Sequence, residues 1–220
     1  MREEFRNELK ALKAEVVQIS NDVTETTRLA VRSLVDGDVD IAEQVIAGDA
    51  AFDRRCLGVE EHAIEIIATQ FPVARDLRLL YSLTYISLHL ERMADLGVNI
   101  ARATKRTAAR RGPQTLYDLI QAQGNLVYRV LEAMSEALAT SDIELARKLE
   151  DLDEPIDHLY KQFFRELGRL QEDEDIEWAS SMVLAARYLE RIADNAVDIG
   201  ERIAYLVTGE FEGAFTPTEE

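Results

Sequence analysis

Residues 90–100 read LERMADLGVNI and residues 189–199 read LERIADNAVDI, so one pattern occurs twice at a spacing of 99 residues. Acidic residues upstream of each copy also repeat, at a spacing of 104 residues, as from Asp49 to Asp153. Similarity at a regular spacing is typical of a duplicated structural unit. The difference of five residues falls in a connection upstream of each motif, where insertions are tolerated. The sequence therefore predicts two related halves.

Apolar residues follow a helical period through nearly the whole chain. Leu9, Leu12, Val16, Ile19 and Val23, for example, recur at steps of three and four residues. Gly, Pro and clustered polar residues interrupt this period at a few points, and no segment shows the alternation of a strand. Helices are expected up to residue 36 and over about 38–69, 74–110, 116–139, 142–170 and 176–207.

The fold class predicted from this pattern is all-α. Two tandem three-helix bundles, related by an internal pseudo-twofold axis, account for both the repeat and the six expected helices. Residues 1–110 make the first repeat, residues 115–208 the second and residues 209–220 a flexible tail, with Arg111–Pro113 as the linker. The short connections predict that neighbouring helices are antiparallel.

The composition excludes several classes of protein. The 220 residues include 42 Asp and Glu against 25 Lys and Arg, a formal net charge of −17, which argues against direct binding to nucleic acid or to an anionic membrane. Cys56 is the only cysteine, so an intrachain disulfide and a thiolate zinc site are both impossible. Since no stretch approaches the ~20 apolar residues of a membrane span, we expect a cytoplasmic protein that reaches a membrane only through a partner.

Each half carries pairs of acids four residues apart on two successive predicted helices. Residues four apart share a helix face, and like charges there destabilise a helix by roughly 0.2–0.5 kcal/mol unless a cation lies between them. A further oxygen-bearing side chain follows one turn later. The candidates are Asp49, Asp53, Glu91, Asp95 and Asn99 in the first half, and Asp153, Asp157, Glu190, Asp194 and Asp198 in the second.

Two interpretations of these acids remain open. Carboxylates gathered between bundle helices are the usual way in which helical proteins bind iron or other divalent ions. Alternatively, the acids face solvent and pair with arginines, since Glu132 and Glu136 show how common this spacing is in so acidic a chain. Recurrence on corresponding helices favours a metal ion or a cationic partner. Asp198 occupies the position that Asn99 has in the first half. The additional carboxylate predicts tighter metal binding in the second half.

No pattern of catalytic residues is present, and we expect no enzyme activity. The chain lacks the glycine-rich phosphate loops and the nucleophile elbow. A di-iron enzyme or a metal-storage protein is the alternative. The di-iron signature, however, places His three residues after Glu, whereas Glu91 and Glu190 are followed there by Ala94 and Ala193.

Two arginines near the start of the third predicted helix are candidate partner contacts. Arg75 and Arg78 have no counterparts in the second half, where the corresponding segment is acidic. A partner would therefore meet two unequal halves. The alternative is a salt-bridged helix start.

Residues 71–78 (FPVARDLR), followed by LERMAD at 90–95, VNIA at 98–101 and LERIAD at 189–194, resemble the PhoU family of phosphate-signalling regulators. The resemblance spans roughly residues 3–208. It implies a pair of three-helix bundles. It also implies a cytoplasmic adaptor that links the ATPase subunit of the phosphate ABC transporter to a sensor histidine kinase and represses the phosphate-starvation response when phosphate is plentiful.

The resemblance has consequences for the acids as well. Some members of the PhoU family bind iron or other metal ions through such acidic pairs, so the ten residues named above become the expected metal ligands. A homodimer is a further expectation.

Overall fold

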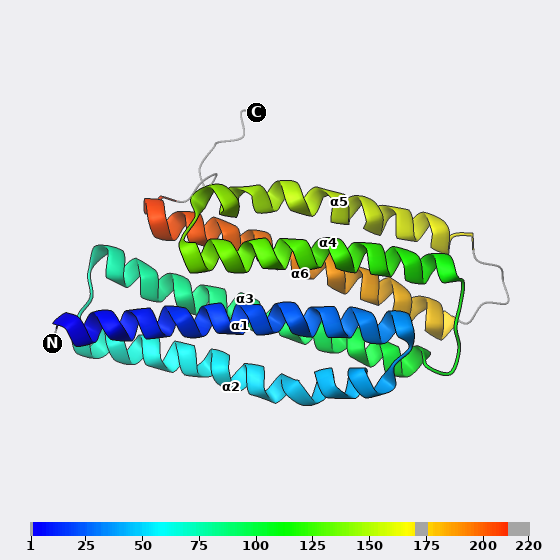
Figure 1. Cartoon of the computed structure of the whole chain (residues 1–220), viewed down its shortest axis with the longest axis horizontal. Helices are drawn as coiled ribbons and strands as arrows, with labels where there is room; N and C mark the ends of the chain where they lie inside the picture. The colour runs from blue at the N-terminus through cyan, green and yellow to red at the C-terminus, as the bar shows by residue number, and fades with distance from the viewer. Residues whose placement is uncertain (1, 170–175, 211–220) are drawn as a thin grey trace, which may run out of the picture.

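The computed structural model describes residues 2–169 and 176–210, and these residues form helices without any strand (Figure 1). The helices are long and lie roughly side by side. They are α1 (Arg2–Asp36), α2 (Val39–Gln70), α3 (Ala74–Thr107), α4 (Gln114–Thr140), α5 (Ile143–Leu167) and α6 (Ile176–Thr208). The predicted all-α class is confirmed.

The second helix of each half begins in the same way. Asp38 is the N-cap of α2, and its carboxylate accepts a hydrogen bond of 3.0 Å from the Ile41 amide. Asp142 does the same for α5 by accepting a 3.0 Å hydrogen bond from the Leu145 amide. Such a cap satisfies one of the free amides of the first helical turn. Gly37 precedes the first cap with a φ of +71°, a conformation that costs glycine little.

The helix ends differ from the expected ones by a few residues. α3 ends at Thr107 rather than near residue 110, α4 begins at Gln114, and α5 ends at Leu167 after continuing through Pro155. Residue 170, the expected end of that helix, lies outside the described residues, as does most of the predicted tail, of which only residues 209–210 are described.

The connection between the halves is anchored to both of them. Arg111 donates hydrogen bonds to the carbonyl oxygens of Val35 and Asp36 at the end of α1, the latter at 3.2 Å. Its guanidinium also lies 4.5 Å from the centroid of the Tyr117 ring in α4. The predicted linker therefore holds the end of α1 and the start of α4 in place.

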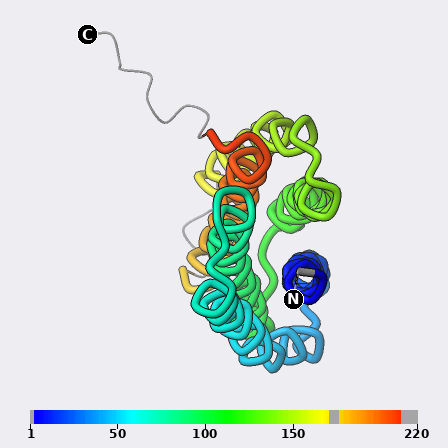
Figure 2. The backbone as a smooth tube through the Cα atoms, turned by 90° about the vertical axis from the view of Figure 1, so that its left-hand side faces the viewer, coloured from blue at the N-terminus to red at the C-terminus, as the bar shows by residue number. Residues whose placement is uncertain are grey.

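The helices are arranged as two three-helix bundles that share a broad contact. α1, α2 and α3 pack on one another, as do α4, α5 and α6, while α1 lies against α4 and α3 against α6. Figure 2 shows α2 and α5 at the two outer ends of this arrangement. Because each helix at the central contact meets its counterpart from the other half, exchanging the halves reproduces the arrangement. The predicted pseudo-twofold repeat is confirmed.

The inner helices α3 and α6 are buried along most of their lengths. Small side chains, including Ala94 and Ala101 of α3 and Ala186 and Ala193 of α6, are fully or almost fully buried. Large residues such as Leu90 and Leu189 are fully buried in the same core, and burying each one contributes about 1.5–3 kcal/mol. The core therefore holds the acid-bearing helices firmly.

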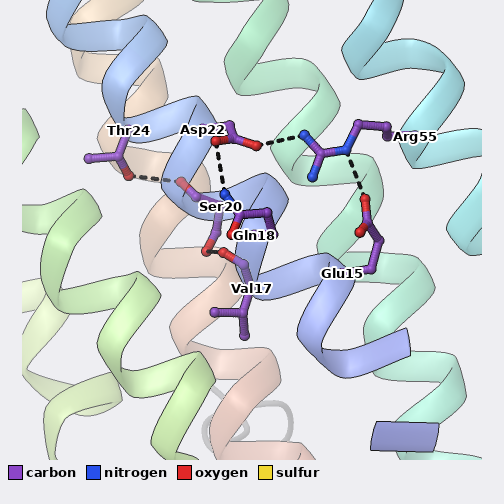
Figure 3. Close-up of polar contacts among 7 residues, drawn as sticks. All are labelled: Glu15, Val17, Gln18, Ser20, Asp22, Thr24 and Arg55. Carbon is purple, nitrogen blue, oxygen red and sulfur yellow. Dashed lines mark hydrogen bonds and ion pairs between the residues drawn. The ribbon is translucent and has the colours of Figure 1, made fainter. Parts of the chain in front are cut away.

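Polar contacts fix the rotation of α2 against α1. Arg55 of α2 donates hydrogen bonds to the Glu15 carboxylate at 2.8 Å and to the Asp22 carboxylate at 2.6 Å, both on α1 (Figure 3). Gln18 orients Asp22 through a 3.1 Å hydrogen bond. Residues two apart on a helix lie about 200° apart, so directing Arg55 toward α1 leaves Asp53 on the opposite side of α2.

In the part of the chain that the structure describes, none of the helices has both the length and the apolar character that crossing a membrane requires.

Two glycines on the inner helices provide a test of the packing. A Cβ atom on Gly200 would lie 2.8 Å from the Ala146 carbonyl oxygen, whereas one on Gly97 would come no closer than 3.8 Å to Thr26. Gly200→Ala should therefore lower the free energy of unfolding by about 1–3 kcal/mol, because α5 must move. Gly97→Ala should raise it by up to ~1 kcal/mol through helix propensity. Urea unfolding of both variants measures the difference, and equal effects would contradict this packing.

Candidate metal centres

The first cluster of acids forms between α2 and α3. Asp49 and Asp53 lie on α2, and Glu91 and Asp95 lie on α3. Burial raises the pKa of Asp49, and the charges of Asp95 and Asp53 raise it further. The pKa of Glu91 is raised first by burial and then by Asp95 and Asp53. The structure therefore brings together the four carboxylates that the spacing selected, and they repel one another.

The second cluster forms between α5 and α6 at the corresponding place. Burial raises the pKa of Asp153 to about 6, with smaller contributions from the charges of Asp194 and Asp157. Burial likewise raises the pKa of Asp194, and Asp157 and Asp198 add to that effect. Asp157 therefore lies close enough to disfavour the ionised forms of both Asp153 and Asp194, and Asp198 disfavours that of Asp194.

One oxygen in each cluster is buried without a hydrogen-bond partner. These atoms are Oδ1 of Asp49 and Oδ1 of Asp153, which occupy equivalent positions of the two repeats. A buried acceptor left unsatisfied costs about 1–3 kcal/mol, and more when the group is charged. The same unfavourable feature therefore occurs in both halves, at the points where a cation would relieve it.

Three of the predicted ligands have other partners. Glu190 forms an ion pair with Arg187 on the same helix. Asn99 accepts a 3.0 Å hydrogen bond from Arg102. Asp198 places Oδ2 3.6 Å from Nδ1 of His89. Within residues 2–169 and 176–210, no three His, Cys, Asp or Glu side chains converge closely enough to hold a metal ion.

Arginines lie near both clusters, as the alternative interpretation of the sequence expected, although the sequence analysis did not name which arginines. Arg102 lies close enough to Asp49 to lower its pKa, against the larger effect of burial. Arg187 lowers the pKa of Asp194 in the same way, as well as pairing with Glu190. The spacing of three residues between Arg187 and Glu190 was a usable signal, because residues at that spacing meet on a helix.

His89 is a packing residue between the halves. It is buried at the contact of α3 with α6, where Nδ1 lies 2.8 Å from Oδ1 of Asn195. Its ring centroid lies 4.4 Å from that of Tyr85, and burial lowers its pKa. A neutral imidazole that bridges two helices explains its burial without a role as a metal ligand.

The two candidate contact arginines have different surroundings. Arg75 is exposed at the start of α3. Arg78 is partly buried, and its guanidinium packs beside Gly209, just after the end of α6. Only Arg75 is therefore freely presented to a partner, while Arg78 also connects α3 to the end of the second half.

Comparison with known proteins identifies the group to which this arrangement belongs. The PhoU domain matches residues 16–104 and 120–203, which are the two repeats described above. The chain belongs to the PhoU family. The crystal structure of PhoU from Pseudomonas aeruginosa superposes with a TM-score of 0.89 at 28% identity, over 94% of this chain and 100% of that one.

Other members are similar over most of their length. The phosphate-specific transport system accessory protein PhoU homolog 1 of Methanothermobacter thermautotrophicus is 30% identical, over 94% of this chain and 95% of its own. The phosphate transport system regulatory protein PhoU from Streptococcus pneumoniae has a TM-score of 0.85 at 28% identity, over 94% of this chain and 98% of its own. Their names describe accessory or regulatory proteins of phosphate transport.

The raised pKa of Asp153 predicts a pH-dependent loss of stability. A carboxyl whose pKa is near 6 when folded and about 3.8 when unfolded binds its proton more tightly in the folded state. Its ionisation therefore destabilises the fold increasingly from about pH 4 to pH 6 and by a constant amount above that. Because Asp153 is only half-buried, solvent screening reduces the effect to about 1 kcal/mol.

Asp153→Asn should accordingly raise the free energy of unfolding by about 1 kcal/mol at pH 7.5, with little change at pH 4. Urea unfolding at both pH values, without added metal, measures this. The control is Asp151→Asn, which removes the same charge from an exposed neighbour. Equal effects of the two variants at pH 7.5 would show that Asp153 is not destabilising.

Proposed function

We propose that this protein is a cytoplasmic regulatory adaptor of inorganic-phosphate uptake and signalling. It represses the phosphate-starvation response by linking the ATPase subunit of the phosphate ABC transporter to a sensor histidine kinase. Membership of the PhoU family is the observation that carries this proposal. The accessory and regulatory names of its relatives support a role without catalysis. It approaches the membrane through these partners and acts as a homodimer.

Hard cations at the two acid clusters are part of this proposal. The carboxylates suit such ions chemically, and the unpartnered oxygens of Asp49 and Asp153 lie where an ion would compensate them. Asp49, Asp53, Glu91 and Asp95 would hold one ion, and Asp153, Asp157, Asp194 and Asp198 the other. A bound ion would neutralise carboxylates that now repel one another. Rotation of the side chains is required, since they do not converge as they stand.

The inner helices offer a route between the clusters and the partner surfaces. α3 carries half of the first cluster and α6 half of the second, and these helices pack together. Neutralising one cluster would relieve repulsion across α2 and α3, or across α5 and α6. Helices that repel each other less pack more closely. The outer helices α2 and α5 would then be held more rigidly where the adaptor meets its partner.

The regulatory role is tested by deleting the gene in its host. Expression of phosphate-starvation genes in phosphate-rich medium, followed with a reporter, should rise several-fold in the deletion strain. The wild-type gene and the Asp151→Asn variant should restore repression. The Asp49→Asn/Asp153→Asn variant should restore it only partly. Normal repression in the deletion strain would refute the regulatory role.

Metal binding is tested separately by thermal unfolding of the tag-free protein. Saturating Mn²⁺ should raise the melting temperature by several degrees, since a ligand at 100 times its Kd stabilises a fold by about 2.7 kcal/mol. Asp49→Asn/Asp153→Asn should remove most of this shift. A chelator serves as the control. The same shift in the variant would place the ions elsewhere on this acidic surface.

A further inference from the structure

A long apolar groove runs between α2 and α3 on the outside of the first half. Its wider part, near the tip of these helices, has a volume of about 620 Å³ and is lined by Ile64, Ile67, Leu77 and Tyr81 among others. Tyr205 of α6 and Gly209, just after α6, close this part on the side of the second half. A second hollow of about 360 Å³ continues it past Leu57 and Leu88. Glu60 and Thr84 line both hollows. The two hollows therefore form one continuous feature, called here the α2–α3 groove.

The α2–α3 groove has a floor of small residues and walls of large ones. Its floor contains four small side chains, Cys56, Ala63, Thr84 and Ser87. Six large apolar residues along the walls are between 36% and 58% exposed: Leu57, Ile64 and Ile67 on α2, and Leu77, Tyr81 and Leu88 on α3. Grouped exposure of this kind marks an interaction surface, unlike single exposed apolar residues.

The second half shows that the fold does not require this apolar surface. At the repeat spacings, Leu57 corresponds to Lys161, Tyr81 to Ser180 and Leu88 to Arg187. In the second half, Arg187 pairs with Glu190, and its guanidinium lies 5.8 Å from the centroid of the Tyr160 ring. Tyr160 in turn contacts Phe164, which is 45% exposed, so the equivalent place carries both a charge and an apolar side chain. The second half thus replaces three of the groove's large apolar residues by polar or charged ones and keeps an apolar residue, Ile176, at the position of Leu77. The fold tolerates these replacements, so the continuous apolar surface of the first half is not needed for packing alone.

The ends of the groove carry opposite charges. Asp53 and Glu91 line the end near the first acid cluster. Arg78 lines the end near the tip, with the exposed Arg75 close by in sequence. Glu60 lies between them. The groove is thus negative at one end, apolar along its walls and positive at the other end.

We propose that the α2–α3 groove is the docking site for an amphipathic α-helix of a partner protein. In protein free of metal ions, the apolar stripe of that helix lies on the small floor residues, and its basic end meets Asp53 and Glu91. Its acidic end meets Arg75 and Arg78. The 14 steps from Asp53 to Ile67 span roughly 21 Å, the length of about four helical turns. A convex helix fits a hollow between two helices, and helix-in-groove recognition follows this pattern.

Other occupants fit less well. Two copies of the chain facing each other here would place hollow against hollow and leave the small floor residues uncovered. An anionic membrane would be repelled by the acidic end and by a net charge of −17. This inference names a type of partner for the proposed adaptor, and in that sense it rests on the proposed function, but its test measures binding alone.

The probe is an 18-residue synthetic peptide with leucines at helical spacing, lysines in one terminal turn and glutamates in the other. It is made in both sequence orders, because the groove admits two helix directions. Fluorescence anisotropy should give a micromolar Kd for one order. A version with glutamine at both ends should bind at least tenfold more weakly. The same tenfold loss is expected for Leu57→Lys/Leu88→Arg, which introduces the residues of the second half at those positions.

The matched control is Leu184→Lys, which places a charge at an exposed leucine of α6, away from the groove. It should bind the peptide as the wild type does, and circular dichroism should show that both variants are folded. Equal affinity of the wild type and Leu57→Lys/Leu88→Arg would overturn the proposal. Failure of both peptide orders to bind would also overturn it. Sedimentation showing that Leu57→Lys/Leu88→Arg converts a dimer into monomers would overturn it as well. If the peptide binds but the deletion strain shows normal repression, the groove is supported as a docking site and the proposed regulatory function is refuted.

Discussion

The contact between α3 and α6 is the constraint on which the rest of the structure depends. These two helices are buried along most of their lengths, and each carries acids that face an outer helix of its own bundle. Their packing fixes where α2 and α5 must lie. Because the same contact is formed from both halves, the two acid clusters occupy equivalent places. The repeat therefore gives two acid clusters from a single structural solution.

The clusters are retained against their own electrostatics. Asp49 and Asp153 each have a buried oxygen without a partner, and their neighbours raise their pKa values further. A protein is stable by only about 5–15 kcal/mol, so two such features use an appreciable part of that margin. The hydrophobic core around Leu90 and Leu189 holds the carboxylates in position. A buried oxygen without a partner that recurs at equivalent positions calls for an explanation, and the proposed bound cation provides one.

Periodicity and turn residues predict the six helices well, because each helix contributes an apolar stripe to the common core. The acid clusters were predictable too, since i and i+4 positions must share a face. The partner of each side chain was not predictable, because sequence spacing does not determine side-chain rotamers. Glu190 pairs with Arg187, and Asn99 pairs with Arg102. The α2–α3 groove was also missed, because Leu57 and Leu88 follow the same helical steps as core residues.

Anomalous X-ray scattering from crystals grown with Mn²⁺ tests the central claim, that the repeated acid clusters are a pair of cation sites. The account predicts one peak beside Asp49 between α2 and α3, and a second beside Asp153 between α5 and α6, with the two unpartnered oxygens turned toward the metal. Crystals that show no peak at either place, or peaks only at other acidic residues of the surface, would contradict it.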